Sequence, residues 1–541
     1  MFKPRTAQPV RKTSSSDRKT TSGTAARRSP EKREAPVNPY ASKKNAAYLP
    51  AESAERPYPT ERPYQAERPA GAPARVSSKP RQDKSGQDRP RSDKRSTSRP
   101  ASSARPASAA KSAGASVRFD EKPRPAAVIG ANPGARINRR AADCLRAGFL
   151  WVYASDLESI EVPAGDPPAL LPVADSRGLL LGTALYSPTS QIALRVISRE
   201  AIDEAQWLKL LAVRLSAAIA RRKPLLDAQQ GATTDSLRLC FSEADDLPGL
   251  IIDKYAGLII VQLLAKGLDS AAVREAVVHV LRAELKPDAI IERPDPRMRE
   301  LEGLSAPSNE PLWIAKKAEG SAATEFQING LQFHFDANSG QKTGAFLDQR
   351  ANYAAARDWA KQLGATGRAL DVCTYQGGFA LHLAQVCKEV TGIDASRASL
   401  EVAERNAEAN RAQLTAPVEW VEGDAFEILR GWSDAGEKFD AIVLDPPAFA
   451  KSVRAVEGAL RGYKELNLRA LRMLRPGGLL VTCSCSHHVS WSDLESAVSS
   501  AAVDAGRRVR LLERRGAAID HPVILNLPET EYLKCLILEV E

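Results

Sequence analysis

Cysteine is scarce in this chain, and its spacing excludes two kinds of site. There are seven cysteines in 541 residues, and no two of them form a CxxC pair. CxxC pairs are the usual elements of zinc sites and redox-active dithiols, so we expect neither, and we expect no bound metal. An odd number of scattered cysteines in a long chain is typical of a reducing compartment.

Long apolar runs are also missing. No segment approaches the roughly 18 uninterrupted apolar residues of a membrane-spanning helix. The N-terminal stretch MFKPRTAQPVRKTSSS has no apolar run after its charges, which is unlike a secretory leader. We therefore expect a soluble cytoplasmic protein without a membrane partner.

Positive charge is confined to one end of the chain. Residues 1–135 hold 29 Lys and Arg against 12 Asp and Glu, a net charge of +17, whereas the remainder carries −7. Residues 1–133 consist mainly of Pro, Ser, Ala, Arg and Lys, with too few apolar residues to form a core. We expect a disordered tail, which either binds RNA non-specifically through its charge or only keeps the protein in solution.

The rest of the sequence is predicted to form three domains. Residues 134–203 contain short apolar runs between Gly and Ser-Pro turns, which predicts a small β-rich domain. Residues 204–325 begin with a helix and continue with strands around a glycine turn, which predicts a central α/β domain. Residues 326–541 form the third domain.

Strands and helices alternate regularly in the third domain. Such alternation predicts an α/β fold with a mostly parallel sheet covered by helices on both faces. Ser492 and Glu495 match an S-x-x-E capping box, which predicts the start of the last of these helices. The expected strands are 368–373, 389–394, 418–422, 440–445 and 478–483, and the expected helices are 379–387, 398–410, 456–474 and 493–505.

Most of these strands end on, or lead into, an aspartate. Ligands of such sheets bind at the carboxyl ends of the strands. The first loop, DVCTYQGGF, is not a GxGxxG fingerprint because its glycines, Gly377 and Gly378, come late, so a dinucleotide is not expected. Ionised carboxylates only accept hydrogen bonds, and S-adenosylmethionine is a cation rich in donors. We expect Asp371 at its methionine end, Asp394 at its ribose and Asp424 at its adenine, although each could also be a cap or turn residue.

The tripeptide DPP at 445–447 predicts a rigid turn where a substrate base would lie. Pro446 and Pro447 fix the backbone and remove two hydrogen-bond donors. Asp445 could accept a hydrogen bond from a base amino group or hold a ring nitrogen. The plain alternative is a turn that ends the strand.

Several longer stretches, in order, resemble one known family. They are LPGLIIDKYAG, QKTGAFLDQR, LDVCTYQGGFA, GEKFDAIVLDPPAFAKS, GYKELNLRALRMLRPGG, SCS and AIDHPVILNLPETEYLK. From about Ala135 onward the chain resembles the RlmI-type family, S-adenosylmethionine-dependent enzymes that make 5-methylcytosine in large-subunit ribosomal RNA. The resemblance implies a PUA-like RNA-binding domain, a central α/β domain and a class I Rossmann-like methyltransferase domain with a seven-stranded sheet. The basic tail is not part of it.

The resemblance also implies roles for individual residues. Carbon 5 of cytosine needs a thiolate that adds to ring carbon 6, and Cys485 stands where the family places that nucleophile, with Asp445 orienting the flipped base. For Cys483 we expect packing, which is also the plain alternative for Cys485. The implied cofactor contacts are Asp371, Tyr375, Gly377, Gly378, Asp394, Asp424 and Asp445, with Gln349 a further candidate. The implied RNA contacts are Pro446, Pro447, Phe449, Lys342 and Arg350.

One departure keeps alternatives open. The wider group of RNA 5-methylcytosine enzymes has a second cysteine after the proline of the DPP region, and this chain has Ala448 and Phe449 there. A methyltransferase acting on a guanine nitrogen would need no cysteine. An RNA-binding ribosome-assembly protein without catalysis is the other alternative. The sequence leaves open which nucleotide is modified and whether the chain forms a homodimer.

Overall fold

The computed structural model describes residues 134–541 except 164–168, 228–232, 306–309, 316–321 and 338–343. The predictions made for the tail, residues 1–133, and for Lys342 therefore lie outside the described residues.

The first folded module is rich in β-structure, as predicted. Its six strands form one sheet in the order β2-β6-β5-β4-β1-β3. The apolar side chains of β4, β5 and β6 alternate with the pleat, so that Leu171, Val173, Leu194 and Val196 meet in one core with helix α1. The elements are β1 Gly134–Ile137, α1 Arg139–Arg146, β2 Trp151–Tyr153, β3 Leu157–Glu161, β4 Leu170–Asp175, β5 Leu180–Tyr186 and β6 Ile192–Ser198.

The second module is mixed α/β, also as predicted. Its sheet has the order β11-β10-β9-β8-β7, and the helices α2 and α3 pack on it through Trp207, Leu211 and Val277. The elements are α2 Glu204–Asp227, β7 Ser236–Phe241, β8 Leu250–Tyr255, β9 Leu258–Leu263, α3 Ala271–Leu285, β10 Ala289–Glu292, α4 Pro296–Leu301 and β11 Trp313–Ile314. The hairpin of β12 (Ala323–Ile328) and β13 (Leu331–Asp336) follows, and the boundary predicted at residue 326 falls inside β12.

The third module is a seven-stranded sheet in the order β16-β15-β14-β17-β18-β20-β19. All neighbouring strands are parallel except β20, which runs antiparallel to both β18 and β19. The strands are β14 Arg368–Val372, β15 Glu389–Asp394, β16 Val418–Glu422, β17 Phe439–Leu444, β18 Leu474–Ser484, β19 Val509–Arg515 and β20 Lys534–Val540. The helices are α5 Arg350–Leu363, α6 Gly378–Ala384, α7 Arg397–Ala409, α8 Ala425–Ala435, α9 Val456–Met473 and α10 Trp491–Ala505.

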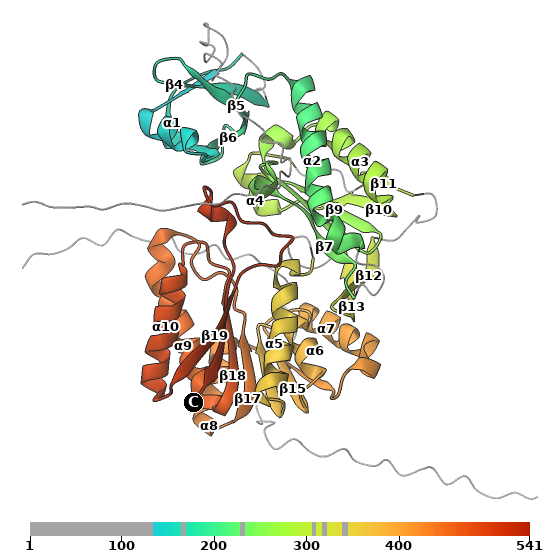
Figure 1. The fold of residues 1–541 in the computed structure, drawn as a ribbon, viewed down its shortest axis with the longest axis vertical. Coiled ribbons are helices and arrows are strands. Elements are labelled where there is room, and N and C mark those ends of the chain that lie inside the picture. The colour runs from blue at the N-terminus through green and yellow to red at the C-terminus, as the bar shows by residue number, and fades with distance from the viewer. Residues whose placement is uncertain (1–133, 164–168, 228–232, 306–309, 316–321, 338–343) are drawn as a thin grey trace, which may run out of the picture. The chain divides into compact units, whose positions relative to one another are not determined.

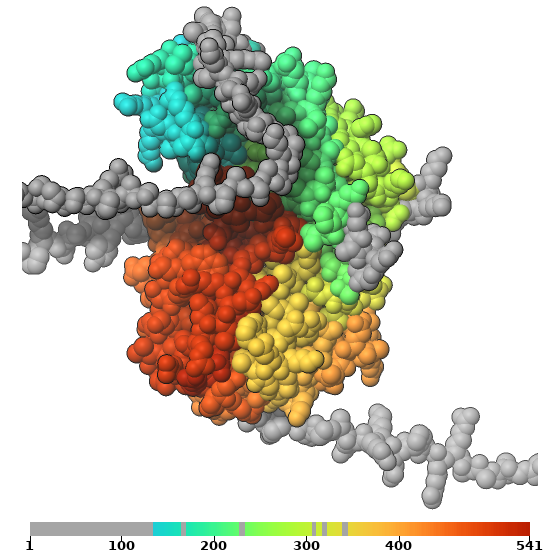
Figure 2. Space-filling model, in the orientation of Figure 1, coloured from blue at the N-terminus to red at the C-terminus, as the bar shows by residue number. Residues whose placement is uncertain are grey.

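Helices cover both faces of this sheet (Figure 1). Successive strand residues point to opposite faces, so Val443 and Val481 pack with α5 and α6, whereas Ile442 and Leu480 pack with α9 and α10. Figure 2 shows the yellow atoms of the region of α5 beside red atoms of the C-terminal part of the chain, and Trp359 of α5 donates to Glu513 of β19. The fold class predicted from the βα alternation is confirmed. Because helices cover both faces of the sheet, the ends of the strands are left for a ligand site.

The capping prediction is wrong by two residues. Ser490, not Ser492, caps α10, and Asp493 completes the box by accepting from the backbone N–H of Ser490. The sequence contains two overlapping candidates for the box, Ser490 with Asp493 and Ser492 with Glu495. Because Asp can take the place of Glu, the pattern alone does not decide between them.

Candidate active site

A cavity of about 500 Å³ opens at the carboxyl ends of β14, β15, β17 and β18. The sequence predicts this edge, because the carboxyl ends of parallel strands meet there. The cavity is lined by ten of the predicted site residues: Gln349, Tyr375, Gly378, Asp394, Asp424, Asp445, Pro446, Pro447, Phe449 and Cys485. It is also lined by Phe346, Asp348, Cys373, Phe426 and Leu533.

The loop after β14 holds three residues in the left-handed backbone region. Cys373 has φ 64°, Tyr375 φ 52° and Gly377 φ 86°, a conformation that is costly for the two non-glycine residues and typical of functional loops. Tyr375 is fixed at both ends, since its N–H donates to Asp394 Oδ2 (2.9 Å) and its hydroxyl to the Gly344 carbonyl (3.1 Å). At Gly378 a β-carbon would lie 2.5 Å from the Tyr353 ring, so only glycine lets α6 begin there.

Asp371 lies beneath this loop and does not line the cavity. Its Oδ2 accepts from the Thr374 hydroxyl (2.6 Å) and the Ala380 N–H (2.8 Å), while its Oδ1 has no hydrogen-bond partner among the described residues. Burial is the main cause that raises the pKa of Asp371 to about 7. Asp371 thus supports the loop from behind, and Oδ1 is its one acceptor without a partner among the described residues, so its cofactor contact stays a prediction. Gly377 is also absent from the lining and instead precedes α6 as its N-cap.

Asp394 and Asp424 act as turn and cap residues, and both also line the cavity, where their cofactor contacts stay a prediction. The oxygens of Asp394 accept the backbone N–H groups of Tyr375 and Ser396, each at 2.9 Å. Asp424 caps α8 by accepting from Phe426 and Glu427. Each carboxylate has about four acceptor positions, so both retain capacity toward the cavity that they line.

Asp445 is oriented by the segment that precedes α5. Gln349 Nε2 donates to both carboxylate oxygens of Asp445, at 3.0 Å each, and Gln349 Oε1 accepts from Asn352 (2.6 Å). The Cys485 sulfur lies 3.9 Å from the Pro446 carbonyl oxygen, so the cysteine and the DPP turn meet at one end of the cavity.

Cys483 and Cys485 lie in different surroundings. Strand β18 ends at Ser484, and Cys485 is the first residue beyond it, half-buried on the cavity wall. Cys483 is fully buried in the core opposite Cys535 of β20, and burial raises its pKa well above the usual value. A buried neutral thiol of this kind is a packing residue.

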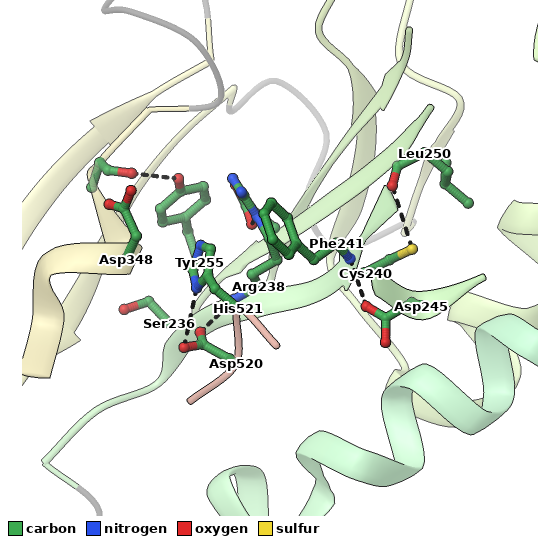
Figure 3. Close-up of polar contacts among 12 residues, drawn as sticks. Ser236, Arg238, Cys240, Phe241, Asp245, Leu250, Tyr255, Asp348, Asp520 and His521 are labelled. Atoms are coloured by element: carbon green, nitrogen blue, oxygen red, sulfur yellow. Dashed lines mark hydrogen bonds and ion pairs between the residues drawn. The ribbon is translucent and has the colours of Figure 1, made fainter. Parts of the chain in front are cut away.

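Arg350 is not available to RNA. Its guanidinium is buried, pairs with Asp520 (Nη2 to Oδ1, 3.0 Å) and donates to the Ser236 carbonyl (2.9 Å). Figure 3 shows Ser236 and Asp520 with the neighbouring Arg238 and His521. The phosphate contact expected for Arg350 is corrected, because this side chain is already committed to an internal ion pair.

Asp348 and Phe426 are among the residues of the cavity wall that sequence reasoning missed. The Asp348 carboxylate accepts from the Tyr532 hydroxyl, and Asp348 lines the cavity. Phe426 packs its ring near Phe449, with 5.9 Å between ring centroids. Its place two residues after Asp424, at the start of a helix, is the one local signal that could have identified it.

The site suits S-adenosylmethionine. A volume of about 500 Å³ lies within the usual range for cofactor pockets. Asp394 and Asp424 offer acceptors to hydroxyl and amino donors, Ile393 and Phe426 offer apolar walls, and Asp371 Oδ1 leaves a buried acceptor under the loop. In the described part of the chain, no group of three or more His, Cys, Asp or Glu could hold a metal ion. No helix of that part is long and apolar enough to span a membrane.

Comparisons with known proteins agree with this architecture. Residues 135–199 match the family model of a PUA-like domain, and residues 301–514 match that of an S-adenosylmethionine-dependent methyltransferase. The ribosomal RNA large subunit methyltransferase I of Pseudoalteromonas translucida is 36% identical over 394 residues, which cover 72% of this chain and 95% of the relative. The enzyme of the same name from Tolumonas auensis is 37% identical over 72% of this chain and 94% of the relative.

Solved structures show the same fold. A protein from Streptococcus mutans, described as an S-adenosylmethionine-dependent methyltransferase, superposes with a TM-score of 0.62 at 18% identity. The match covers 75% of this chain and 100% of that one. A similar structure, with the same TM-score of 0.62, was determined in complex with S-adenosylhomocysteine.

Proposed function

Because the chain belongs to the ribosomal RNA large subunit methyltransferase I family, we propose that it methylates carbon 5 of a cytosine in that RNA. The coarser activity, S-adenosylmethionine-dependent methylation of large-subunit ribosomal RNA, follows from the family. The choice of cytosine carbon 5 rests on one observation, the Cys485 sulfur on the cavity wall beside Pro446.

The chemistry explains why a cysteine is needed at this place. Carbon 5 of cytosine is a weak nucleophile, and addition of the Cys485 thiolate to carbon 6 raises the electron density at carbon 5. S-adenosylmethionine would supply the methyl group that carbon 5 takes, and S-adenosylhomocysteine would be left. The proton on carbon 5 leaves to water or a basic group, and elimination of the thiolate restores the ring double bond. A base must leave its stacked position to reach the cavity, which costs a few kcal/mol.

Asp445 is placed to orient that base. Gln349 occupies one acceptor position on each oxygen of Asp445, which fixes the plane of the carboxylate. Because Asp445 also lines the cavity, its carboxylate can accept from the exocyclic amino group of cytosine, and Pro446 and Pro447 hold the turn rigid.

Replacing Asp394 by alanine should weaken cofactor binding. The substitution removes an acceptor for the ligand and also releases the Tyr375 N–H, which Asp394 holds. Hydrogen bonds to a charged group contribute about 1.5–3 kcal/mol, so the Kd for S-adenosylhomocysteine should rise about 10- to 100-fold by calorimetry. Asp434→Ala, at an exposed position of α8, is the matched control and should leave the Kd unchanged. An unaltered Kd in folded Asp394→Ala would contradict the assignment.

Nucleoside mass spectrometry of large-subunit ribosomal RNA tests the target atom. RNA from a strain lacking this chain should lose one 5-methylcytosine, and the purified chain should restore it. Loss of an N-methylguanosine instead would support the guanine alternative. Unchanged nucleosides in the deletion strain would leave only an RNA-binding role.

A further inference from the structure

The backbone on both sides of Cys485 is held by a chain of hydroxyl groups. The Ser484 hydroxyl donates to the Tyr463 hydroxyl (2.9 Å), which lies 3.1 Å from the Ser486 hydroxyl. The Ala450 N–H donates to the same Ser486 oxygen (3.2 Å). Because Tyr463 belongs to α9 and Ala450 to the loop after the DPP turn, the position of Cys485 is fixed relative to both.

Lys534 reaches this segment from the other side. It is the first residue of β20 and lies opposite Ser484 in the antiparallel pair of β18 and β20. The residue is only 3% exposed, and its Nζ donates to the Ser486 carbonyl (2.9 Å). The backbone of Lys534 therefore pairs with Ser484, the residue before Cys485, whereas its ammonium group binds Ser486, the residue after Cys485. A buried ammonium is costly in free energy unless a negative charge compensates it.

Three negative or ionisable groups interact with this ammonium. Burial lowers the pKa of Lys534, and the charges of Glu531, Cys485 and Asp493 oppose that shift. Glu531 accepts from the Trp491 indole at the surface, and Asp493 is engaged in capping α10. Cys485 is the one of the three that lines the cavity.

Other groups also face Cys485. Tyr463, from α9, interacts with it electrostatically, and burial raises the pKa of this tyrosine so that it stays neutral. Asp348 and Asp445 line the same cavity, and their negative charges disfavour a thiolate. A nearby positive charge favours ionisation of Cys485, and Lys534, whose Nζ donates to the carbonyl of the adjacent Ser486, interacts electrostatically with Cys485.

We propose that Lys534 is a positioning residue whose fixed positive charge favours the thiolate form of Cys485 over the thiol. The inference rests on the proposed function, in which Cys485 is the nucleophile. The thiol proton leaves to solvent, and the positive charge of the ammonium stabilises the thiolate that remains. The thiolate is the reactive form of cysteine, so the effect of Lys534 is on the fraction of enzyme that is ready to attack.

Alkylation of Cys485 by iodoacetamide measures this fraction without RNA or cofactor. The full chain is alkylated at a series of pH values, and peptide mass spectrometry follows the mark on Cys485. In Lys534→Met the midpoint of the pH dependence should move up by about one unit or more, and Lys534→Arg should restore most of the shift. Lys534→Gln keeps a donor without the charge and should behave like Lys534→Met, which separates charge from hydrogen bonding and provides a second variant if methionine impairs folding.

Lys254→Met is the matched control. Lys254 also donates from Nζ to a backbone carbonyl, that of Asp235 (3.1 Å), and burial lowers its pKa, but it lies on β8 of the second module and does not line the cavity. Its loss should leave the Cys485 midpoint unchanged.

In turnover assays, Lys534→Met should lower kcat about tenfold at pH 7, with recovery as the pH rises and an unaltered KM for RNA.

An unchanged midpoint in folded Lys534→Gln or Lys534→Met would overturn the role of Lys534. That failure can be told apart from failure of the proposed function. If Cys485→Ala still methylates RNA, the proposed function fails, whatever the alkylation midpoint shows. If Cys485→Ala is inactive and the midpoint does not move, only the inference about Lys534 fails.

Discussion

Replacing Cys485 by alanine should abolish methyl transfer, with a loss of about 10³-fold or more in kcat, which corresponds to about 4 kcal/mol in the barrier. Without the sulfur, carbon 5 of cytosine is too weak a nucleophile to accept a methyl group. The measurement is transfer of a labelled methyl group to ribosomal RNA isolated from a strain that lacks this chain. Binding of S-adenosylhomocysteine should remain, because the predicted acceptors for the cofactor, Asp394 and Asp424, are intact.

Cys483→Ala is the matched control for this variant. It removes the same side chain two residues earlier, where the thiol is buried opposite Cys535 and away from the cavity lining. It should cost some stability and leave turnover within a few-fold of wild type.

RNA containing 5-fluorocytosine should form a denaturation-resistant adduct with the wild-type chain, because fluorine cannot leave as a proton. An active Cys485→Ala enzyme would argue for the guanine nitrogen as the target.

Replacing Asp520 by alanine should be the most destabilising of the changes considered. The Asp520 carboxylate is buried and accepts from Arg350 (3.0 Å) and from the Arg238 N–H (2.8 Å). Its removal leaves a guanidinium buried without its partner, which costs about 3–5 kcal/mol in the free energy of unfolding. Denaturant titration measures the loss. Glu457→Ala, which breaks an exposed ion pair with Arg461, should cost less than about 1 kcal/mol.

The Asp520 carboxylate also makes the free energy of unfolding depend on pH. Burial alone would raise the pKa of Asp520, but His521, Arg350 and the Arg238 N–H outweigh it and bring the pKa below its ordinary value. A carboxyl whose pKa is lower in the folded than in the unfolded chain stabilises the fold above its unfolded pKa, near about 4. That contribution is lost as the pH falls further. Between about pH 5 and 3, wild type should therefore lose more stability than Asp520→Ala, and equal losses would contradict this role.

The parts of the site that sequence predicts are those that depend on local order along the chain. Each strand leads directly into its loop, so Asp394, Asp424, Asp445 and Cys485 could be assigned to one edge of the sheet before the structure was known. Asp371 looks the same in the sequence, yet Thr374 and Ala380 hold it under the loop. That difference depends on how the loop folds back, which no spacing rule describes.

Contacts between distant segments were beyond sequence reasoning. Arg350 and Asp520 are 170 residues apart, and nothing near Arg350 indicates that its charge is already paired. Lys534 meets Ser484 only because β20 runs antiparallel beside β18, and the five strands placed from the sequence did not include β20. In both cases the missing information is the pairing of elements, not the type of residue.

The hydrogen bonds around Asp520 determine where the chain can be cut without disturbing the third module. Arg222 and Arg238, from α2 and β7, both donate to Asp520, and Arg350 bonds the Ser236 carbonyl of β7. Gln349, the neighbour of Arg350, is the residue that orients Asp445. Cutting the chain at residue 326 would remove Arg222, Arg238 and Ser236, which hold Asp520 and Arg350, and Arg350 is the neighbour of Gln349 on the cavity wall. We therefore expect the third module to need the second module for the geometry of its cavity.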